Sequence, residues 1–277
     1  MLIDSHAHLN FPDYAADFDE VVARAREAGV DKIINIGTSL ADSETAVRLA
    51  QKCDWMYATV GRHPNDSPSA TVDNVDWEKL EQLAKSPKVV GIGECGLDYS
   101  KFSQKGMYVT SRDRDLQPTP SEPERQKKLF RKQIEIAQKL SLPLSIHIRQ
   151  AQEDLREIFS SDDESIHHLS GVFHCFSGDE RYVRFIFEKL PNFYISFAGN
   201  LTYKNSQPLR DLAKLVPLER LLVETDCPFL SPEGLRGKRN EPANVKLTAM
   251  KLAEVKGVSL EKIAKITTEN AEGLFNI

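Results

Sequence analysis

Short apolar segments alternate with amphipathic segments along almost the whole sequence, and this alternation restricts the possible folds more than any other feature. Short apolar runs between turn residues are typical of buried strands, whereas apolar residues at helical spacing are typical of helices. Strand–helix alternation predicts a parallel sheet whose strands are joined by crossover helices. The predicted strands are Leu2–Ser5, Lys32–Ile36, Met56–Val60, Val89–Gly93, Leu144–Ile146, Gly171–Phe173, Phe193–Ser196 and Arg220–Glu224.

Eight such strands favour closure into a TIM-type (β/α)8 barrel over an open sheet. The first strand is not followed by a G-x-G-x-x-G pattern, which argues against a dinucleotide-binding fold. The length of 277 residues is ordinary for one barrel, so we expect a single α/β domain over residues 1–277. The predicted helices are Phe18–Ala28, Ser43–Lys52, Trp77–Ala84, Glu124–Leu140, Glu153–Phe159, Arg181–Lys189, Asn244–Lys256 and Ser259–Phe275.

One segment, at about residues 100–124, interrupts the alternation. It is rich in Ser, Pro and charged residues, and Pro118, Pro120 and Pro123 prevent a continuous helix. Because it follows the fourth predicted strand, it would emerge on the face where barrel enzymes bind substrates. A long loop insertion there is either a lid that contacts substrate or a segment without fixed structure, and the sequence leaves both readings open.

Composition excludes several classes of protein. A hydrophobic content of 40% with 28% charged residues is typical of a globular protein, and no apolar run approaches the roughly 20 residues of a membrane helix. The N-terminus has no secretory pattern and the four cysteines form no CxxC pair, so we expect a cytoplasmic protein. The net charge of −5 argues against non-specific wrapping of DNA, but bound cations could still accommodate a phosphate substrate.

A pair of histidines, His6 and His8, stands at the end of the first predicted strand. Side chains alternate across a strand, so these two residues can aim at one point in the barrel mouth. Two polar histidines near a strand end would explain an isolated pair of this kind equally well. The pair by itself therefore leaves metal binding open.

Residues of metal-binding type recur at later strand ends, and they decide between these readings. The C-terminal ends of barrel strands converge on one face, where enzymes of this fold have their active sites. Four histidines and two carboxylates in one pocket would be costly to desolvate without a cation. The sequence therefore predicts a site for two divalent metal ions, with the ligands His6, His8, Glu94, His147, His174 and Asp226.

At these residues the sequence resembles the TatD-like deoxyribonucleases, a branch of the metal-dependent hydrolase superfamily. The matching stretches follow the family order across nearly the whole chain, which makes the resemblance specific. They are IDSHAHLNF, VGRHPND, VVGIGECGLDY, LPLSIHIRQA, FHCFSG, ISFAGNLTYKN, LLVETDCPFLSP and RGKRNEPANV.

The resemblance implies a division of the ligands between two metals. One metal would be bound by His6, His8 and Asp226, the other by His147 and His174, and Glu94 would bridge the two. The resemblance also places His63 in the pocket, in contact with substrate or with the residues that surround the ligands, and not with metal. We expect Asp226, Glu94 and His63 to take part in catalysis.

Three features depart from the family pattern without removing a ligand. Gln150 stands where an acidic residue is usual, Arg62 stands where an apolar residue is more common, and the segment at 100–124 is longer than usual. These differences concern the preference for substrate. They leave the reaction class unchanged.

Basic residues near the expected barrel mouth are candidates for binding phosphate. Arginine can bind phosphate through two hydrogen bonds, and Arg149 follows His147 by two residues, so it can share that direction. An exposed Lys or Arg is more commonly plain surface, which is the alternative for each candidate. The predicted substrate-binding residues are Arg62, Arg149, Lys204, Arg236 and Arg239.

The resemblance implies hydrolysis of phosphodiester bonds in DNA, in several family members as a 3′–5′ exonuclease. An acyl hydrolase, such as a D-aminoacyl-tRNA deacylase, is the first alternative, because some relatives act on aminoacyl-tRNA and one site could serve both reactions. A non-catalytic metal-binding protein is the second. Histidine-rich ligation favours Zn or Mn over Mg, although the family commonly uses Mg. We expect a nucleic acid substrate, no membrane partner and a monomer.

Overall fold

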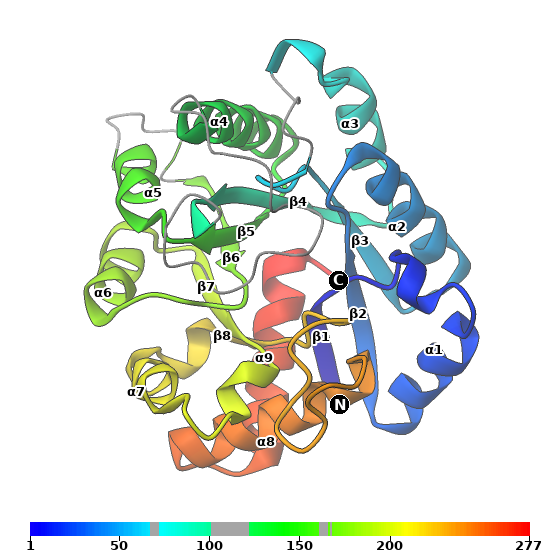
Figure 1. Ribbon diagram of the computed structural model, residues 1–277, viewed down its shortest axis with the longest axis vertical. Helices are drawn as coiled ribbons and strands as arrows, with labels where there is room; N and C mark the ends of the chain where they lie inside the picture. Colours follow the sequence, from blue (N-terminus) through cyan, green and yellow to red (C-terminus); the bar gives the residue numbers. More distant parts are fainter. Residues whose placement is uncertain (67–71, 101–121, 161–165, 167) are drawn as a thin grey trace.

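The computed structural model describes residues 1–66, 72–100, 122–160, 166 and 168–277. Within these residues, eight parallel strands form one sheet in chain order, and helices surround it (Figure 1). The predicted TIM-type barrel is confirmed. The strands are β1 (Leu2–Ala7), β2 (Val30–Ile36), β3 (Met56–Val60), β4 (Val89–Asp98), β5 (Leu144–Arg149), β6 (Gly171–Phe173), β7 (Phe193–Phe197) and β8 (Leu221–Val223).

The helices follow the predicted order with small differences at their ends. Several begin at a side chain that accepts a hydrogen bond from the first turn, such as Ser39 before α2 and Asp179 before α6. The helices are α1 (Phe18–Glu27), α2 (Leu40–Lys52), α3 (Trp77–Ala84), α4 (Glu122–Leu140), α5 (Gln152–Phe159), α6 (Glu180–Lys189), α7 (Gln207–Leu215), α8 (Val245–Lys256) and α9 (Leu260–Phe275).

Two helix boundaries differ from the prediction because of proline. Helix α7 was not predicted; its Pro208 lies in the first turn, where a missing N–H costs nothing. Helix α4 begins at Glu122 with Pro123 in its first turn, so Pro123 does not interrupt it. Residues 101–121 of the predicted insertion lie outside the described residues.

Strand β4 is longer than predicted. The sequence prediction ended it near Glu94, but the strand continues to Asp98. Gly93 and Gly96 suggest a strand end in the sequence, yet Gly96 allows close approach to β5, because a Cβ there would collide with the carbonyl oxygen of His147. The extension carries Asp98 to the same face of the barrel as Glu94.

The lower part of the barrel interior is apolar. Residues from β1, β2, β4, β6 and β8 meet in one buried cluster, and strands so far apart around a barrel meet only inside it. The end of α9 contributes Leu274 and Phe275 to this cluster and so closes one end of the barrel. The polar residues discussed below lie at the other end, where the strands finish. None of the helices in the described part of the chain combines the length and apolarity that a membrane span requires.

The barrel closes where β1 meets the segment that follows β8, and we call residues 4–8 and 223–228 the β1–β8 seam. Ala7 pairs with Cys227 in an isolated parallel bridge. The amide of His8 donates to Cys227 O at 2.9 Å, and the amide of Asp226 donates to His6 O at 2.9 Å. The buried Asp4 carboxyl adds two bonds, which it accepts from the Thr225 amide (2.9 Å) and hydroxyl (2.6 Å). Three predicted metal ligands are thus part of the closure itself.

Candidate metal centre

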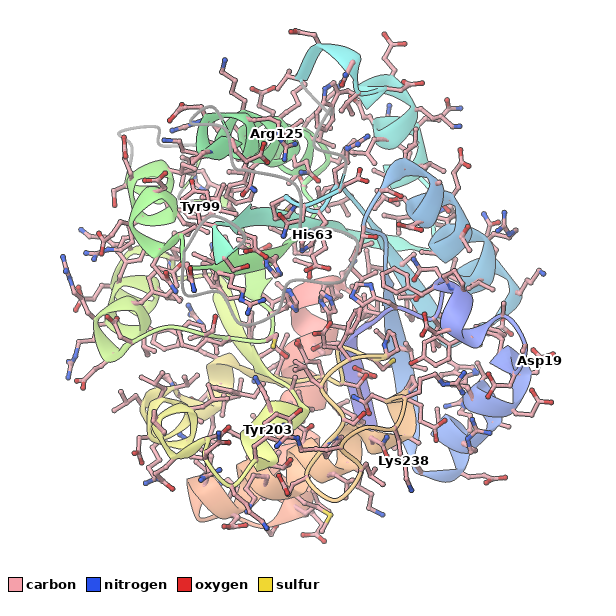
Figure 2. All side chains as sticks on the ribbon, in the orientation of Figure 1. Asp19, His63, Tyr99, Arg125, Tyr203 and Lys238 are labelled. Atoms are coloured by element: carbon pink, nitrogen blue, oxygen red, sulfur yellow. The ribbon has the colours of Figure 1, made fainter. Side chains whose placement is uncertain are left out.

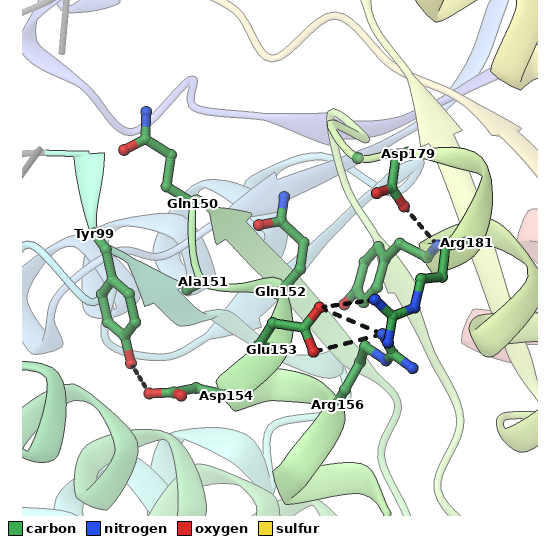
Figure 3. Close-up of a pocket in the computed structure, with 11 residues that line it drawn as sticks. Tyr99, Gln150, Ala151, Gln152, Glu153, Asp154, Arg156, Asp179 and Arg181 are labelled. Atoms are coloured by element: carbon green, nitrogen blue, oxygen red, sulfur yellow. Dashed lines mark hydrogen bonds and ion pairs between the residues drawn. The ribbon is translucent and has the colours of Figure 1, made fainter. Parts of the chain in front are cut away.

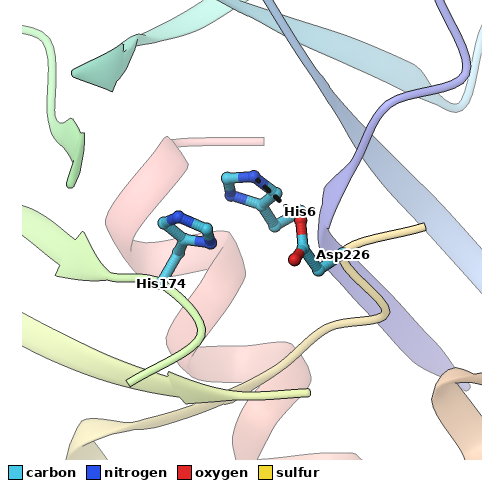
Figure 4. Close-up of side chains that lie close together, drawn as sticks. All are labelled: His6, His174 and Asp226. Carbon is cyan, nitrogen blue, oxygen red and sulfur yellow. Dashed lines mark ion pairs between the residues drawn. The ribbon is translucent and has the colours of Figure 1, made fainter. Parts of the chain in front are cut away.

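The structure brings all six predicted ligands together at the C-terminal end of the barrel. They come from β1, β4 and β5, from the residues that directly follow β1 and β6, and from the third residue after β8. His6 and Asp226 approach each other across the seam, and the ring of His174 stacks on that of His6 with centroids 3.8 Å apart (Figure 4). Of the six, His6, His8, Glu94 and His174 are buried.

Glu94 lies between two groups of ligands and directs one carboxylate oxygen at each. Its Oε2 is 3.6 Å from Nε2 of both His6 and His8. Its Oε1 is 3.0 Å from His147 Nδ1 and 2.9 Å from His174 Nε2. This arrangement is the one that a carboxylate bridging two cations requires.

Asp226 completes the first ligand group, which consists of His6, His8 and Asp226. Its Oδ1 lies 3.4 Å from His8 Nε2 and 3.8 Å from His6 Nε2, and these two nitrogens are 3.2 Å apart. In the second ligand group, His147 Nδ1 and His174 Nε2 are 3.3 Å apart. Ligand atoms around one zinc-sized ion are separated by about 3 to 3.8 Å, given metal–ligand bonds near 2.1 Å and the usual range of bond angles, so both groups match a cation in size.

The histidine rings are oriented so that a lone pair on each faces the centre. His8 Nδ1 lies 3.2 Å from the Ile36 carbonyl, which can only accept, so Nδ1 carries the proton and Nε2 is the unprotonated nitrogen. His147 Nε2 forms a hydrogen bond of 3.1 Å with Asp98 Oδ2, whereas His174 Nδ1 lies at an ion-pair distance of 3.4 Å from Glu224 Oε1 without a hydrogen bond. Metal-binding histidines commonly donate their other N–H to such acceptors. The donor set therefore fits metal ions in its chemistry as well as in its spacing.

His63 lies next to the centre, and with Asp98 and His147 it forms a further group of possible metal ligands. Its Nδ1 accepts a hydrogen bond from the Asn65 amide at 3.0 Å, so in the neutral ring Nε2 carries the proton. That Nε2 lies 3.4 Å from Glu94 Oε1. Burial lowers the pKa of His63 to about 3, which keeps the ring neutral. The geometry makes His63 a hydrogen-bond donor at the edge of the centre.

Both carboxylates of the centre are held in the ionised form. Burial by itself would raise the pKa of Glu94, but the surrounding histidines, His174 first, outweigh burial and hold it well below its usual range. The pKa of Asp226 is also lowered, because the close contact with His8 and the nearby His174 and His6 together exceed the effect of burial. The centre thus presents two negative charges among imidazole nitrogens.

Sequence reasoning assigned no role to three residues that orient the ligands: Asp98, Glu224 and Asn65. Asp98 accepts hydrogen bonds from Asn65 Nδ2 (2.8 Å) and the Ser100 hydroxyl (2.6 Å), in addition to facing His147. Glu224 is fully buried and accepts from the Cys175 amide at 2.7 Å. Both acids lie within four residues of a predicted ligand, Asp98 after Glu94 and Glu224 before Asp226, and this proximity was the available signal.

Replacing Asp98 with asparagine should weaken cation binding by the second ligand group. The change removes the charge that polarises His147 but keeps the shape of the side chain, and loss of such a partner costs about 10- to 100-fold in metal affinity. Titration of metal-free protein with Zn²⁺ against a competing chelator measures the effect. Asp211→Asn, an exposed change on α7, is the matched control. Equal affinity in Asp98→Asn and Asp211→Asn would contradict the role of Asp98.

The five predicted substrate-binding residues fall into two sets. Arg62 lies 2.5 Å from Asp66 Oδ2, and Arg239 pairs with Asp17 and stacks over Tyr14. These two guanidinium groups are engaged in intramolecular ion pairs. The other three residues lie on the face that carries the centre and stay candidates for substrate contact; they are Arg149 at the end of β5, Lys204, and Arg236, whose guanidinium lies 4.5 Å from the Tyr203 ring centroid (Figure 2).

A pocket of about 440 Å³ lies on the same face, between the loops that follow β5 and β6 (Figure 3). Most of the residues that line it are polar or charged, and its charges are largely balanced within the pocket. Arg156 and Arg181 lie 3.4 and 3.9 Å from Glu153 Oε1, and the Tyr99 hydroxyl donates to Asp154 at 2.8 Å. Gln150, which departs from the family pattern, lies at its edge. The pocket offers polar surface for part of a substrate beyond the reacting bond.

Comparisons with known proteins identify the family of this chain. A family model described as TatD-related DNase matches residues 3–276. The chain is 39% identical over 277 residues to the metal-dependent hydrolase YabD of Bacillus subtilis, with all of both chains covered. It is 34% identical over 282 residues to a protein of Citrobacter rodentium named 3′-5′ ssDNA/RNA exonuclease TatD, covering 100% of this chain and 98% of that protein.

A solved structure shows the same fold over the same length. The TatD homologue YjjV of Escherichia coli K12 superposes with a TM-score of 0.83 at 28% identity, and the match covers 100% of this chain and 98% of that one. The family match and the end-to-end relatives show that this chain belongs to the TatD-related DNase family of metal-dependent hydrolases.

Proposed function

We propose that the protein hydrolyses phosphodiester bonds of DNA, acting from 3′ ends, with two divalent cations bound at the centre. The observation that carries the proposal is Glu94, whose two carboxylate oxygens face two separate groups of ligands. The names of relatives such as the ssDNA/RNA exonuclease TatD support nucleic acid as the substrate. Because the donors are mainly imidazole nitrogens, we expect Zn or Mn to bind more tightly than Mg.

The six ligands would be divided between the two cations. The first group would hold one and the second group the other, and Glu94 would be shared between them. When bound, two cations in such a centre activate water and offset the negative charge that develops in the displacement.

Two further side chains would handle protons and orientation. Asp226 would orient the attacking water and accept its proton on the carboxylate, which is ionised and lies at the edge of the first group. His63 would donate its Nε2–H to a phosphate oxygen or to the leaving oxygen, because its tautomer is fixed by the Asn65 amide. Both groups contact the centre, so their effects should appear in turnover.

Replacing Arg149 with alanine should weaken binding of an oligonucleotide more than it slows turnover of bis-p-nitrophenyl phosphate. Arg149 ends the strand that carries His147, and an arginine that binds phosphate acts on affinity for a long polyanion. Affinity of a labelled single strand and turnover of the small diester are measured side by side. Arg184→Ala, an exposed change on α6 whose partner is Glu180, is the control. Equal losses on both substrates would instead assign Arg149 to support of the centre.

Three substrates test the proposed function directly. A 5′-labelled single-stranded DNA, bis-p-nitrophenyl phosphate and a D-aminoacyl-tRNA are each incubated with metal-loaded protein. We expect shortening of the DNA from its 3′ end and release of nitrophenol, without release of the amino acid. Release of the amino acid alone would establish the acyl-hydrolase alternative, and no turnover of any substrate would favour a metal-binding protein without hydrolytic activity.

We further propose that residues 1–277 form one domain and that the protein is a cytoplasmic monomer. A single apolar cluster that includes residues from Leu2 to Ile263 supports one domain. Among the described residues, the exposed large hydrophobic side chains are Met1, Leu215, Phe229 and Met250, which come from separate parts of the chain and give no extended apolar surface for a dimer. Light scattering after size-exclusion chromatography measures the mass.

A further inference from the structure

The aromatic ring of Phe229 is exposed beside the metal centre. Its exposed fraction is 51%, and it lies three residues after Asp226. Among the exposed large hydrophobic residues of the described chain it is the one aromatic residue; Met1 is terminal, and Leu215 and Met250 lie on α7 and α8. Large apolar side chains exposed next to a polar site commonly mark a binding surface.

Phe229 and Phe11 form what we call the aromatic corner. The Phe11 ring stacks on that of His8, with centroids 4.7 Å apart and planes 17° apart. The Phe229 ring is inclined at 76° to Phe11 and at 68° to His8, with centroids 6.2 and 6.3 Å away. A ring set at this angle contacts its neighbours through one edge and leaves a ring face for another planar group.

The loop that carries Phe229 is fixed to the same backbone as Asp226. The Phe229 amide donates to Asp226 O at 2.9 Å. The buried Asn240 side chain donates to Thr225 O at 3.0 Å and to Phe229 O at 2.8 Å, so it spans the loop on both sides of Asp226. Leu230, which follows, has a φ of 53°, a conformation that a leucine adopts only when its surroundings impose it. The exposed ring is therefore held at a set distance from the centre.

We propose that the aromatic corner is a stacking platform for the nucleobase next to the scissile phosphate. The inference rests on the proposed nuclease function and specifies which part of the substrate the protein recognises. With the phosphate at the centre, the attached base must lie a short distance to one side, and an exposed ring face there suits it. Stacking on a ring accepts every base, so the platform would bind single strands without regard to sequence.

The shape of the corner favours a base over an apolar acyl group. An acyl side chain is recognised by an enclosed apolar hollow, whereas Phe229 is half-exposed and most of the residues that line the pocket described on this face are polar or charged. A base needs one apolar face and solvent at its polar edge, and both are present here. The corner thus fits a heterocyclic ring that is stacked and not enclosed.

The test combines a change in the protein with a change in the DNA. A 5′-fluorescein single strand with a phosphorothioate at its 3′-terminal linkage is compared with strands in which either nucleotide of that linkage is abasic. Affinity is measured by fluorescence anisotropy for the metal-loaded wild type, Phe229→Ala, Phe229→Leu and Phe229→Tyr. Leu215→Ala, at the end of α7 on the opposite face of the barrel, is the matched control for loss of an exposed apolar side chain.

In the wild type and in Leu215→Ala, removing the stacked base should weaken binding about tenfold, within the range for one base on one aromatic ring. In Phe229→Ala the intact and abasic strands should bind equally, Phe229→Tyr should behave as wild type, and Phe229→Leu should recover only part of the difference. If removing the base weakens binding by the same factor in Phe229→Ala as in wild type, the stacking platform is overturned, while the nuclease proposal stays in place. Failure of the wild type to bind or cleave any of the strands would overturn both.

Discussion

Replacing Asp226 with asparagine should lower the rate of phosphodiester hydrolysis by roughly two to four orders of magnitude, the usual contribution of a positioned acid–base group. Asparagine keeps the shape and one oxygen ligand but loses the negative charge and the basicity. The second ligand group and Glu94 are untouched, so at least the cation held by His147 and His174 should be retained. Steady-state rates with bis-p-nitrophenyl phosphate and metal analysis of the same preparation measure the two effects together.

The metal analysis separates two ways in which Asp226→Asn could lose activity. If the cation of the first ligand group is also lost, the rate should fall further than the loss of the proton acceptor alone would cause. Asp211→Asn on α7, which changes an exposed aspartate, should keep full activity. A protein with Asn at 226, both cations bound and a near-normal rate would exclude Asp226 as the proton acceptor. His63 would then be the first residue to test in that role.

Replacing Glu94 with alanine should remove cations from both ligand groups and abolish measurable hydrolysis. Each cation loses an anionic ligand, because Oε2 faces His6 and His8 while Oε1 faces His147 and His174. The remaining donors of the second group are then two neutral nitrogens. Elemental analysis of protein purified without chelator should show total metal well below the roughly two equivalents expected of a dinuclear centre.

Glu94→Gln gives a finer version of this experiment. Glutamine keeps the volume and one oxygen but cannot supply an anionic oxygen to each side, so metal content should again fall. Glu188→Ala on α6 is the surface control and should leave metal content unchanged. Full occupancy in both Glu94 variants would rule out a bridging carboxylate and leave two independent sites.

The convergence of the ligands could be predicted because it follows from topology alone. His6, Glu94 and His147 lie at or near the C-terminal ends of parallel strands, and those ends meet on one face of any closed barrel. No knowledge of long-range contacts was needed. The residue types then restricted the chemistry, since histidines and carboxylates buried together are costly to desolvate without a cation.

The residues that orient the ligands could not be predicted in the same way. The role of Asp98 depends on which nitrogen His147 presents to the centre, and on a strand that continues past two glycines. Neither property has a periodic signature in the sequence. Arg239 is a predicted substrate-binding residue whose actual partner could not be read from the sequence. It pairs with Asp17, which is 222 positions away, and the sequence pattern of a basic residue near the mouth is the same with or without such a partner.

The β1–β8 seam makes the catalytic site depend on completion of the chain. Asp4 and Thr225, which are joined across it, are 221 positions apart in the sequence, and the first ligand group draws on both sides. A nascent chain that has not yet emerged as far as β8 lacks Asp226 and cannot form that group. A cation bound there would link the first and the last strands of the barrel. At a concentration of 100 times its Kd, it would raise the free energy of unfolding by about 2.7 kcal/mol. The first ligand group would therefore be the last part of the centre to form during synthesis.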